Sequence, residues 1–180
     1  MIPVRLARPG AWPDLTAIVP EVLVGSYAVP DDAQWLRDEH GVTAVVNLQD
    51  HGDLASKDLR LVELTRAYAA AGVGFQHLPV TDGDVEMLVA RLPAIVEAIE
   101  GAVAAPGRAY VHCNGGFNRA PTAVVAWLHE RRGMSLPDAL AFVKARRSCL
   151  PYVRALERRY GIVVQGCAHS RAPGPSRRRW

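Results

Sequence analysis

The chain has 180 residues, of which 49% are hydrophobic and 22% are charged, and its formal net charge is +3 at pH 7. These values are typical of one globular domain with its own core, and they exclude a mostly disordered chain. No apolar run is long enough to cross a membrane and residues 1–10 lack the apolar segment of a secretory signal, so we expect a cytoplasmic protein.

Strands and helices are predicted to alternate along most of the chain. In chain order, the apolar pattern predicts a strand at 22–26, a helix at 31–40, a strand at 42–48, a helix at 58–71, a strand at 74–80, a helix at 85–103, a strand at 108–111, and helices at 119–132, 135–147 and 152–160. Pro93 lies inside the longest of these helices, where a proline is expected to kink or divide the helix. The alternation predicts a single-domain α/β fold with a mainly parallel central sheet flanked by helices.

The two ends of the chain differ in composition from the middle. Residues 1–17 contain three prolines and are predicted to form an irregular lead-in, and residues 18–165 are predicted to form the folded domain. Residues 166–180 are rich in Arg, Ser, Pro and Gly, a composition typical of a disordered basic tail. The arginines of such a tail are ordinarily solvated, so we expect neither a nucleic-acid partner nor a membrane partner.

The cysteines are too few and too widely spaced for a disulfide framework or a zinc site. They are Cys113, Cys149 and Cys167. We therefore expect no metal and no cofactor. Cys149 precedes Pro151 by two positions and is predicted to be a buried structural thiol, so that Cys113 is the thiol available for chemistry.

The most informative segment is 112–119, which reads His-Cys-Asn-Gly-Gly-Phe-Asn-Arg. A predicted strand ends at His112, a loop containing two glycines follows Cys113, and Arg119 opens a helix. A loop of this kind directs backbone amides into one hollow, and the helix N-terminus adds partial positive charge, so the hollow suits a phosphate dianion. The same field favours the thiolate of Cys113 as a nucleophile, and the planar guanidinium of Arg119 can bind two phosphate oxygens.

This segment resembles the His-Cys-x5-Arg motif of the cysteine-dependent protein tyrosine and dual-specificity phosphatases. Residues 22–28 and 41–48 look like the opening strand–helix–strand of a dual-specificity domain, and the resemblance covers about residues 18–160. Residues 91–93, 119–121 and 147–149 are similar to a narrower group, the plant starch-excess type glucan phosphatases.

The resemblance implies a dual-specificity phosphatase-like catalytic domain that hydrolyses phosphomonoesters through a phosphocysteine intermediate. Cys113 would attack phosphorus, and Arg119 and the loop amides would hold the phosphoryl oxygens. His112 would shape the loop and the environment of the thiolate. The residues expected to form the substrate site are His112, Asn114, Gly115, Gly116, Phe117, Asn118 and Arg119.

The family also uses an aspartate, on a loop roughly thirty residues before the cysteine, as general acid and then general base. Asp82 lies 31 positions before Cys113 and follows a predicted strand, which makes it the leading candidate. Asp84, 29 positions before Cys113, is the alternative. One of the two is expected to cap the following helix.

Three positions depart from the family pattern. Ala120 stands where most members have a Ser or Thr whose hydroxyl helps the thiolate to leave, although the glucan group also tends to carry Ala there. Gly115 and Asn118 replace an Ala and a Gly of the glucan loop. Gly83 replaces the aromatic residue that the glucan group places between its two loop acids.

Several functions are compatible with this pattern. The leading hypothesis is a phosphatase, a monomer, that acts on phosphotyrosine, phosphoserine or phosphothreonine in proteins. A phosphatase of phosphorylated glucan is an alternative, and Ala120 also permits a pseudophosphatase that binds phosphate without turnover. A rhodanese-like sulfurtransferase also places a Cys at the head of an anion-binding loop, but Arg119 and the upstream aspartate favour the phosphatase.

Overall fold

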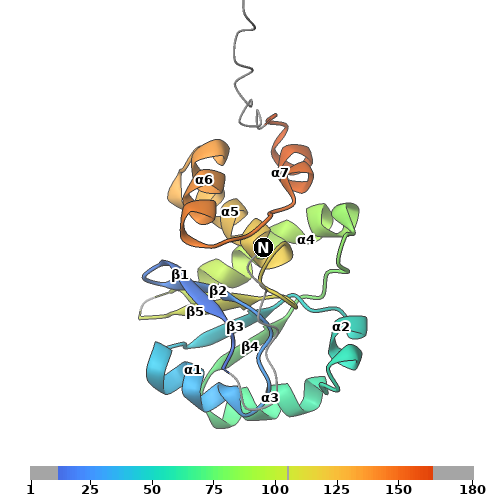
Figure 1. Cartoon of the computed structure of the whole chain (residues 1–180). Helices are drawn as coiled ribbons and strands as arrows, with labels where there is room; N and C mark the ends of the chain where they lie inside the picture. Colours follow the sequence, from blue (N-terminus) through green and yellow to red (C-terminus); the bar gives the residue numbers. More distant parts are fainter. Residues whose placement is uncertain (1–11, 105, 164–180) are drawn as a thin grey trace, which may run out of the picture.

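Five strands form one sheet in the computed structural model, which describes residues 12–104 and 106–163 (Figure 1). The strands are β1 (Leu15–Val19), β2 (Val22–Gly25), β3 (Ala44–Asn47), β4 (Gly74–His77) and β5 (Ala109–His112), in the spatial order β1-β2-β5-β3-β4. β1 pairs antiparallel with β2, and all the other neighbouring pairs are parallel. The predicted α/β fold with a mainly parallel sheet is confirmed.

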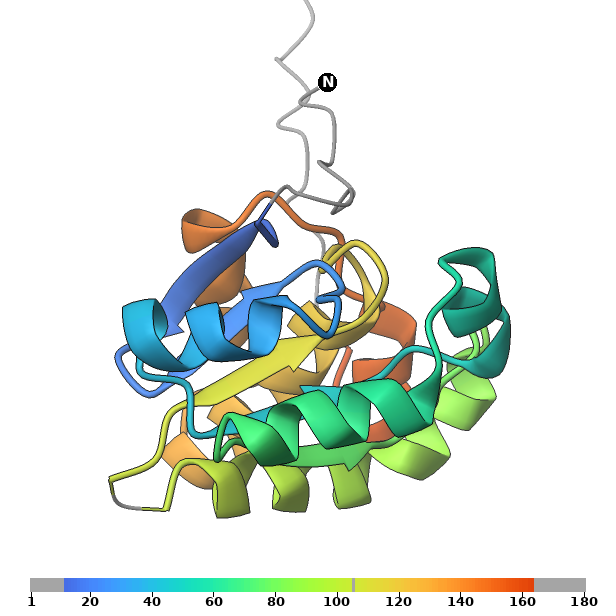
Figure 2. The ribbon, with the colours of Figure 1, turned by 90° about the horizontal axis from the view of Figure 1, so that it is seen from below.

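Helices cover both faces of the sheet. They are α1 (Asp32–His40), α2 (His51–Ser56), α3 (Leu61–Ala70), α4 (Val85–Ala102), α5 (Arg119–Arg132), α6 (Leu136–Arg146) and α7 (Val153–Tyr160). Figure 2, seen from below, shows α1 and α3 in front of the sheet, while α4 to α7 lie on its other side in Figure 1. None of the helices in the described part of the chain is long and apolar enough to cross a membrane.

Two hydrophobic cores result from the alternation of side chains along the strands. Val45 and Tyr110 belong to the core under α1 and α3, whereas their neighbours Val46 and Val111 belong to the core under α4 to α7. Successive residues of a strand point to opposite faces, and both faces are covered here, so the middle residues of β3 and β5 are apolar on both faces. Because β2, β3 and β5 are parallel, their carboxyl ends lie at one edge of the sheet, and the loops that follow them meet there.

Two elements differ from the sequence-based prediction. The prediction of an irregular lead-in at residues 1–17 was wrong for residues 15–17, because β1 begins at Leu15 and forms a tight hairpin with β2. Main-chain pairing across this hairpin overrides the absence of a clear strand pattern in the sequence. The short helix α2 was missed, because six residues are too few to show a helical period.

The other predicted elements are present with small shifts of their ends. Pro93 lies within α4, which continues from Val85 to Ala102 and is not divided. The domain limits 18 and 165 remain predictions. The tail predicted at 166–180 and most of the lead-in lie outside the described residues.

The core under α3 contains a hydroxyl whose removal we expect to stabilise the fold. Tyr68 is completely buried and stacks on Phe75, and its hydroxyl oxygen has no hydrogen-bond partner in the described structure. An unpartnered buried hydroxyl costs about 1–3 kcal/mol. We expect Tyr68→Phe to raise the free energy of unfolding in urea by about 1 kcal/mol. The matched control is Tyr110→Phe, which removes a hydrogen bond of 2.5 Å to the Ser26 carbonyl and should lower that free energy. A Tyr68→Phe protein less stable than the native one would contradict this.

Candidate active site

The loop of residues 113–118, between β5 and α5, has all of its backbone carbonyls held by groups that surround it. We call this segment the phosphate loop. In chain order the partners of its six carbonyls are His112 Nδ1 (3.1 Å), the Tyr27 amide (2.9 Å), Arg147 Nη2 (3.4 Å), Arg147 Nε (2.8 Å), the Leu150 amide (2.9 Å), and the amide and hydroxyl of Thr122 (3.0 and 2.7 Å). In a planar trans peptide the N–H points away from the C=O. The amides that follow these carbonyls therefore turn toward the hollow of the loop, as anion binding requires.

Gly116 is the glycine that this loop geometry requires. Its φ is +63°, and a Cβ built there would lie 2.3 Å from the Gly25 carbonyl oxygen and 2.7 Å from an Arg147 guanidinium nitrogen. Gly115 does not share the positive φ, so of the two glycines in the phosphate loop only Gly116 needs the conformational freedom of glycine.

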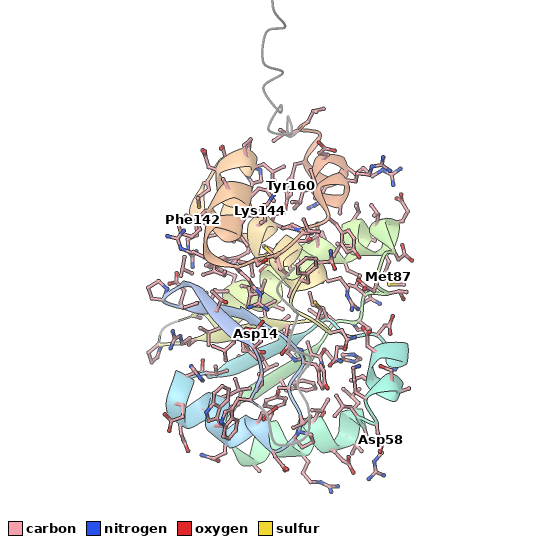
Figure 3. The ribbon with its side chains drawn as sticks, in the orientation of Figure 1. Asp14, Asp58, Met87, Phe142, Lys144 and Tyr160 are labelled. Carbon is pink, nitrogen blue, oxygen red and sulfur yellow. The ribbon has the colours of Figure 1, made fainter. Side chains whose placement is uncertain are left out.

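Arg147 ties the phosphate loop to the first strand of the sheet. Its guanidinium binds the Gly116 carbonyl, the Thr16 hydroxyl at 3.0 Å and the Asp14 carboxylate at 3.0 Å, and the side chain is 5% exposed. Asp14, labelled in Figure 3, directly precedes β1. In the sequence, Arg147 stood out only as part of the segment 147–149 that is similar to the glucan phosphatases. Its role in bracing the loop depends on β1, which the sequence analysis did not predict.

Cys113 and His112 are both buried beneath the hollow, with exposed fractions of 2% and 1%. Burial lowers the pKa of His112 to about 4, although its bond to the Cys113 backbone acts in the opposite direction. The ring is therefore neutral at pH 7, and because a carbonyl only accepts, its proton lies on Nδ1. The neutral, buried ring is bonded to the Cys113 carbonyl at the start of the loop, and it does not supply a positive charge to the thiol.

Arg119 is 1% exposed, and one edge of its guanidinium is fixed to the scaffold. Nη1 donates to Asp53 Oδ2 at 2.6 Å, to the Val80 carbonyl at 2.7 Å and to the Leu48 carbonyl at 3.4 Å. Nε is buried and has no hydrogen-bond partner among the described residues, although Asp82 Oδ1 lies 3.3 Å from it as an ion pair. Burial lowers the pKa of Arg119, but the bond to Asp53 and the nearby acidic groups outweigh it and raise that pKa. Arg119 is thus held as a cation with a donor still available.

Asp53 is a site residue that the sequence analysis missed. It lies on α2, where its carboxylate and that of Asp50 form a reciprocal capping box. The spacing Asp50-x-x-Asp53 directly after a buried strand is the signal that could have revealed this helix. α2 places Asp53 over the edge of the sheet where Arg119 emerges, so the cap of one helix also orients the arginine of the phosphate loop.

The structure separates the roles of the two candidate acids. Asp84 caps α4, where its Oδ1 accepts from the Met87 amide at 2.8 Å. Asp82 has a side chain that is 55% exposed, and its Oδ1 faces Arg119 and accepts a bond of 2.8 Å from the Tyr152 hydroxyl. Asp82 is therefore the carboxylate that lies beside the phosphate loop, and Asp84 serves the helix.

The side chains of the other residues predicted to bind substrate contact the protein itself. The amide nitrogen of Asn118 donates to the Leu150 carbonyl at 2.8 Å, and Asn114 Oδ1 accepts from Gln49 at 3.4 Å, so both side chains are bonded to the scaffold. Phe117 packs against the core under α4 to α7. No group of three His, Cys, Asp or Glu side chains within residues 12–104 and 106–163 is placed to hold a metal ion.

A family model described as "Dual specificity phosphatase, catalytic domain" matches residues 25–155. The chain belongs to this family. Sequence comparison also confirms the similarity to plant phosphoglucan phosphatases. Comparison with solved structures confirms the dual-specificity phosphatase-like fold.

Three similar proteins illustrate the range of this family. The Castanea sativa protein named Phosphoglucan phosphatase DSP4, amyloplastic, is 32% identical over 153 residues, which are 83% of this chain and 40% of that protein. The human Serine/threonine/tyrosine-interacting protein is 25% identical over 138 residues, which are 76% of this chain and 58% of that protein. The crystal structure of human DUSP28 is 27% identical with a TM-score of 0.62, covering 80% of this chain and 88% of that one. The chain spans only about half the length of the two curated relatives.

The bond between Asp53 and Arg119 yields a stability prediction. Asp53→Asn removes the charge that faces the buried guanidinium, and a hydrogen bond to a charged group contributes about 1.5–3 kcal/mol. We expect the free energy of unfolding in urea to fall by about 2 kcal/mol. The matched control is Asp50→Asn, because Asn caps a helix as well as Asp does and the arginine keeps its partner. Equal losses in the two variants would contradict the role assigned to Asp53.

Proposed function

We propose that this dual-specificity phosphatase hydrolyses phosphomonoesters through a phosphocysteine intermediate formed on Cys113. The observation that carries the proposal is the outward bonding of all six carbonyls of the phosphate loop, which turns the amides toward the position in front of Cys113. Arg119 Nε, buried without a hydrogen-bond partner in the described structure, adds a charged donor at the same place. Such preformed donors stabilise the charge that develops on the equatorial oxygens of a transferring phosphoryl group.

In the first step the Cys113 thiolate attacks phosphorus and the bond from phosphorus to the ester oxygen breaks. Asp82 gives its proton to the departing oxygen, so the product leaves as an alcohol or a phenol. In the second step the Asp82 carboxylate removes a proton from water, the water oxygen attacks phosphorus, and the phosphorus–sulfur bond breaks. Inorganic phosphate is released, and the thiolate and the protonated carboxyl are regenerated.

The substrates that we propose are phosphotyrosine, phosphoserine and phosphothreonine in proteins. A phosphorylated glucan is the second candidate, and the observation that favours it is the similarity to the plant phosphoglucan phosphatase. Gly83, which has a φ of +82° and no side chain, stands between the two loop acids and offers no aromatic surface to a sugar ring. Release of phosphate from phosphopeptides, compared with release from phosphorylated amylopectin, distinguishes the two classes.

The covalent mechanism is tested by replacing the nucleophile. We expect Cys113→Ser to lower the turnover of p-nitrophenyl phosphate by more than about a thousandfold, because loop amides alone do not ionise a hydroxyl at neutral pH. Calorimetry should still detect binding of inorganic phosphate, since Arg119 and the amides remain. Cys149→Ala, which removes the other buried free thiol of the described chain, is the control and should retain turnover. Retained turnover in Cys113→Ser would exclude the phosphocysteine.

A substitution at Ala120 tests whether the protein hydrolyses phosphomonoesters or only binds them. Its side chain is completely buried in the core beside the phosphate loop and supplies no hydroxyl to the departing thiolate. If that hydroxyl matters, rapid mixing with p-nitrophenyl phosphate should give a burst of about one equivalent of nitrophenol, followed by a slower steady rate. Ala120→Ser should then raise the steady rate. The absence of a burst together with an unchanged rate in Ala120→Ser would refute this prediction, and binding without any nitrophenol would favour the pseudophosphatase.

A further inference from the structure

The Tyr152 hydroxyl makes two bonds to the loop that carries Asp82. It accepts from the Gly83 amide at 3.0 Å and donates to Asp82 Oδ1 at 2.8 Å. Burial and the bond to Asp82 raise the pKa of Tyr152, so the hydroxyl keeps the proton that it donates. We call residues 81–84 the acid loop. The Tyr152 hydroxyl oxygen therefore contacts both a backbone amide and a side chain of this loop, and the two partners are adjacent residues.

The other end of Tyr152 is bonded to the phosphate loop. Its backbone amide donates to the Thr122 hydroxyl at 2.8 Å, and that hydroxyl donates to the Asn118 carbonyl at 2.7 Å. Thr122 is completely buried, and the Tyr152 ring packs against the core under α4 to α7. Tyr152 is thus a rigid connection between the end of the phosphate loop and the loop that holds the acid.

The acid loop has few other restraints on the carboxylate of Asp82. Residues 81–84 form a turn closed by the Asp84 amide and the Thr81 carbonyl at 3.1 Å, with Gly83 at the position that requires positive φ. This turn sets the direction of the backbone. It does not restrain the Asp82 side chain, which is 55% exposed, so the carboxylate depends on its contacts with Tyr152 and Arg119.

We propose that Tyr152 is a positioning residue that holds the Asp82 carboxyl over the phosphate loop for proton transfer. The inference rests on the proposed role of Asp82 as general acid. Both contacts of the carboxylate are made to Oδ1, so Oδ2 is the oxygen that delivers the proton to the ester oxygen. Arg119 cannot replace Tyr152 in this role, because its Nε is the donor that a bound phosphoryl group would engage.

The experiment compares leaving groups in Tyr152→Phe, which keeps the ring and removes the hydroxyl. General acid catalysis contributes about 10²–10⁴-fold and matters most when the leaving oxygen is basic. We expect kcat/KM for phenyl phosphate to fall about tenfold, while kcat/KM for p-nitrophenyl phosphate falls less than about threefold. The readout is the ratio of kcat/KM for phenyl phosphate to kcat/KM for p-nitrophenyl phosphate, because a merely structural loss would lower both values equally.

Tyr160→Phe is the matched control. The Tyr160 hydroxyl also bonds to a carboxylate, Glu130 at 2.7 Å, but it lies at the end of α7, and Figure 3 shows it well away from Met87 at the start of α4. This variant should leave the ratio of the two substrates unchanged. A Tyr160→Phe enzyme with the same altered ratio as Tyr152→Phe would overturn the inference.

A double variant separates the inference from the function beneath it. If Tyr152 acts through the carboxyl, adding Tyr152→Phe to Asp82→Asn should change neither kcat/KM value by more than about twofold. If Asp82→Asn alters the ratio and Tyr152→Phe alone does not, the positioning role is wrong while Asp82 remains the acid. If Asp82→Asn leaves the ratio of the two kcat/KM values unchanged, Asp82 is not the general acid and the positioning role of Tyr152 is also wrong. The phosphocysteine is tested separately, by Cys113→Ser.

Discussion

The site depends on the bonds that hold the carbonyls of the phosphate loop away from its hollow. A loop of six residues has little burial of its own, and its amides repel one another when they converge, so it needs external partners to keep one shape. Those partners come from the segment after β2, from the first turn of α5, and from residues 147 and 150 beyond α6. The close packing of Gly116 against the Gly25 carbonyl completes the support, because any side chain there would force the loop outward.

Arg119 illustrates how a buried charge is used without a large loss of stability. A guanidinium that is 1% exposed loses nearly all of its hydration, which is costly unless opposite charge and hydrogen bonds replace it. Asp53 and two backbone carbonyls provide that replacement at Nη1. Nε has no hydrogen-bond partner in the described structure, and in the proposed mechanism it is the donor for the phosphoryl group. The short helix α2, which is separated from β5 along the chain by three other elements, therefore helps to fix the guanidinium of Arg119 beside the phosphate loop.

The strand order explains why these parts meet. β5 lies between β2 and β3, so the loops that follow all three strands emerge side by side at one edge of the sheet. The segment after β2 supports the phosphate loop, the segment after β3 carries α2 and Asp53, and the segment after β4 carries the acid loop. Each of these segments therefore contributes a different part of the candidate site.

The sequence by itself determined the fold class and the position of the phosphate loop, because residues 112–119 are contiguous and their strand–loop–helix setting is local. It also led to Cys113 as the proposed nucleophile. It singled out Asp82 and Asp84 as candidate acids from their distance to Cys113 along the chain, but it left open which one caps the helix. Only the tertiary structure assigned Asp53, Arg147 and Tyr152, since their hydrogen-bond partners lie 66, 31 and 70 residues away along the chain. No periodicity or motif encodes such pairs. These hydrogen bonds follow from the crossover connections between parallel strands, which bring loops that are distant in the sequence to the same edge of the sheet. They also follow from the need of each buried polar group for a hydrogen-bond partner.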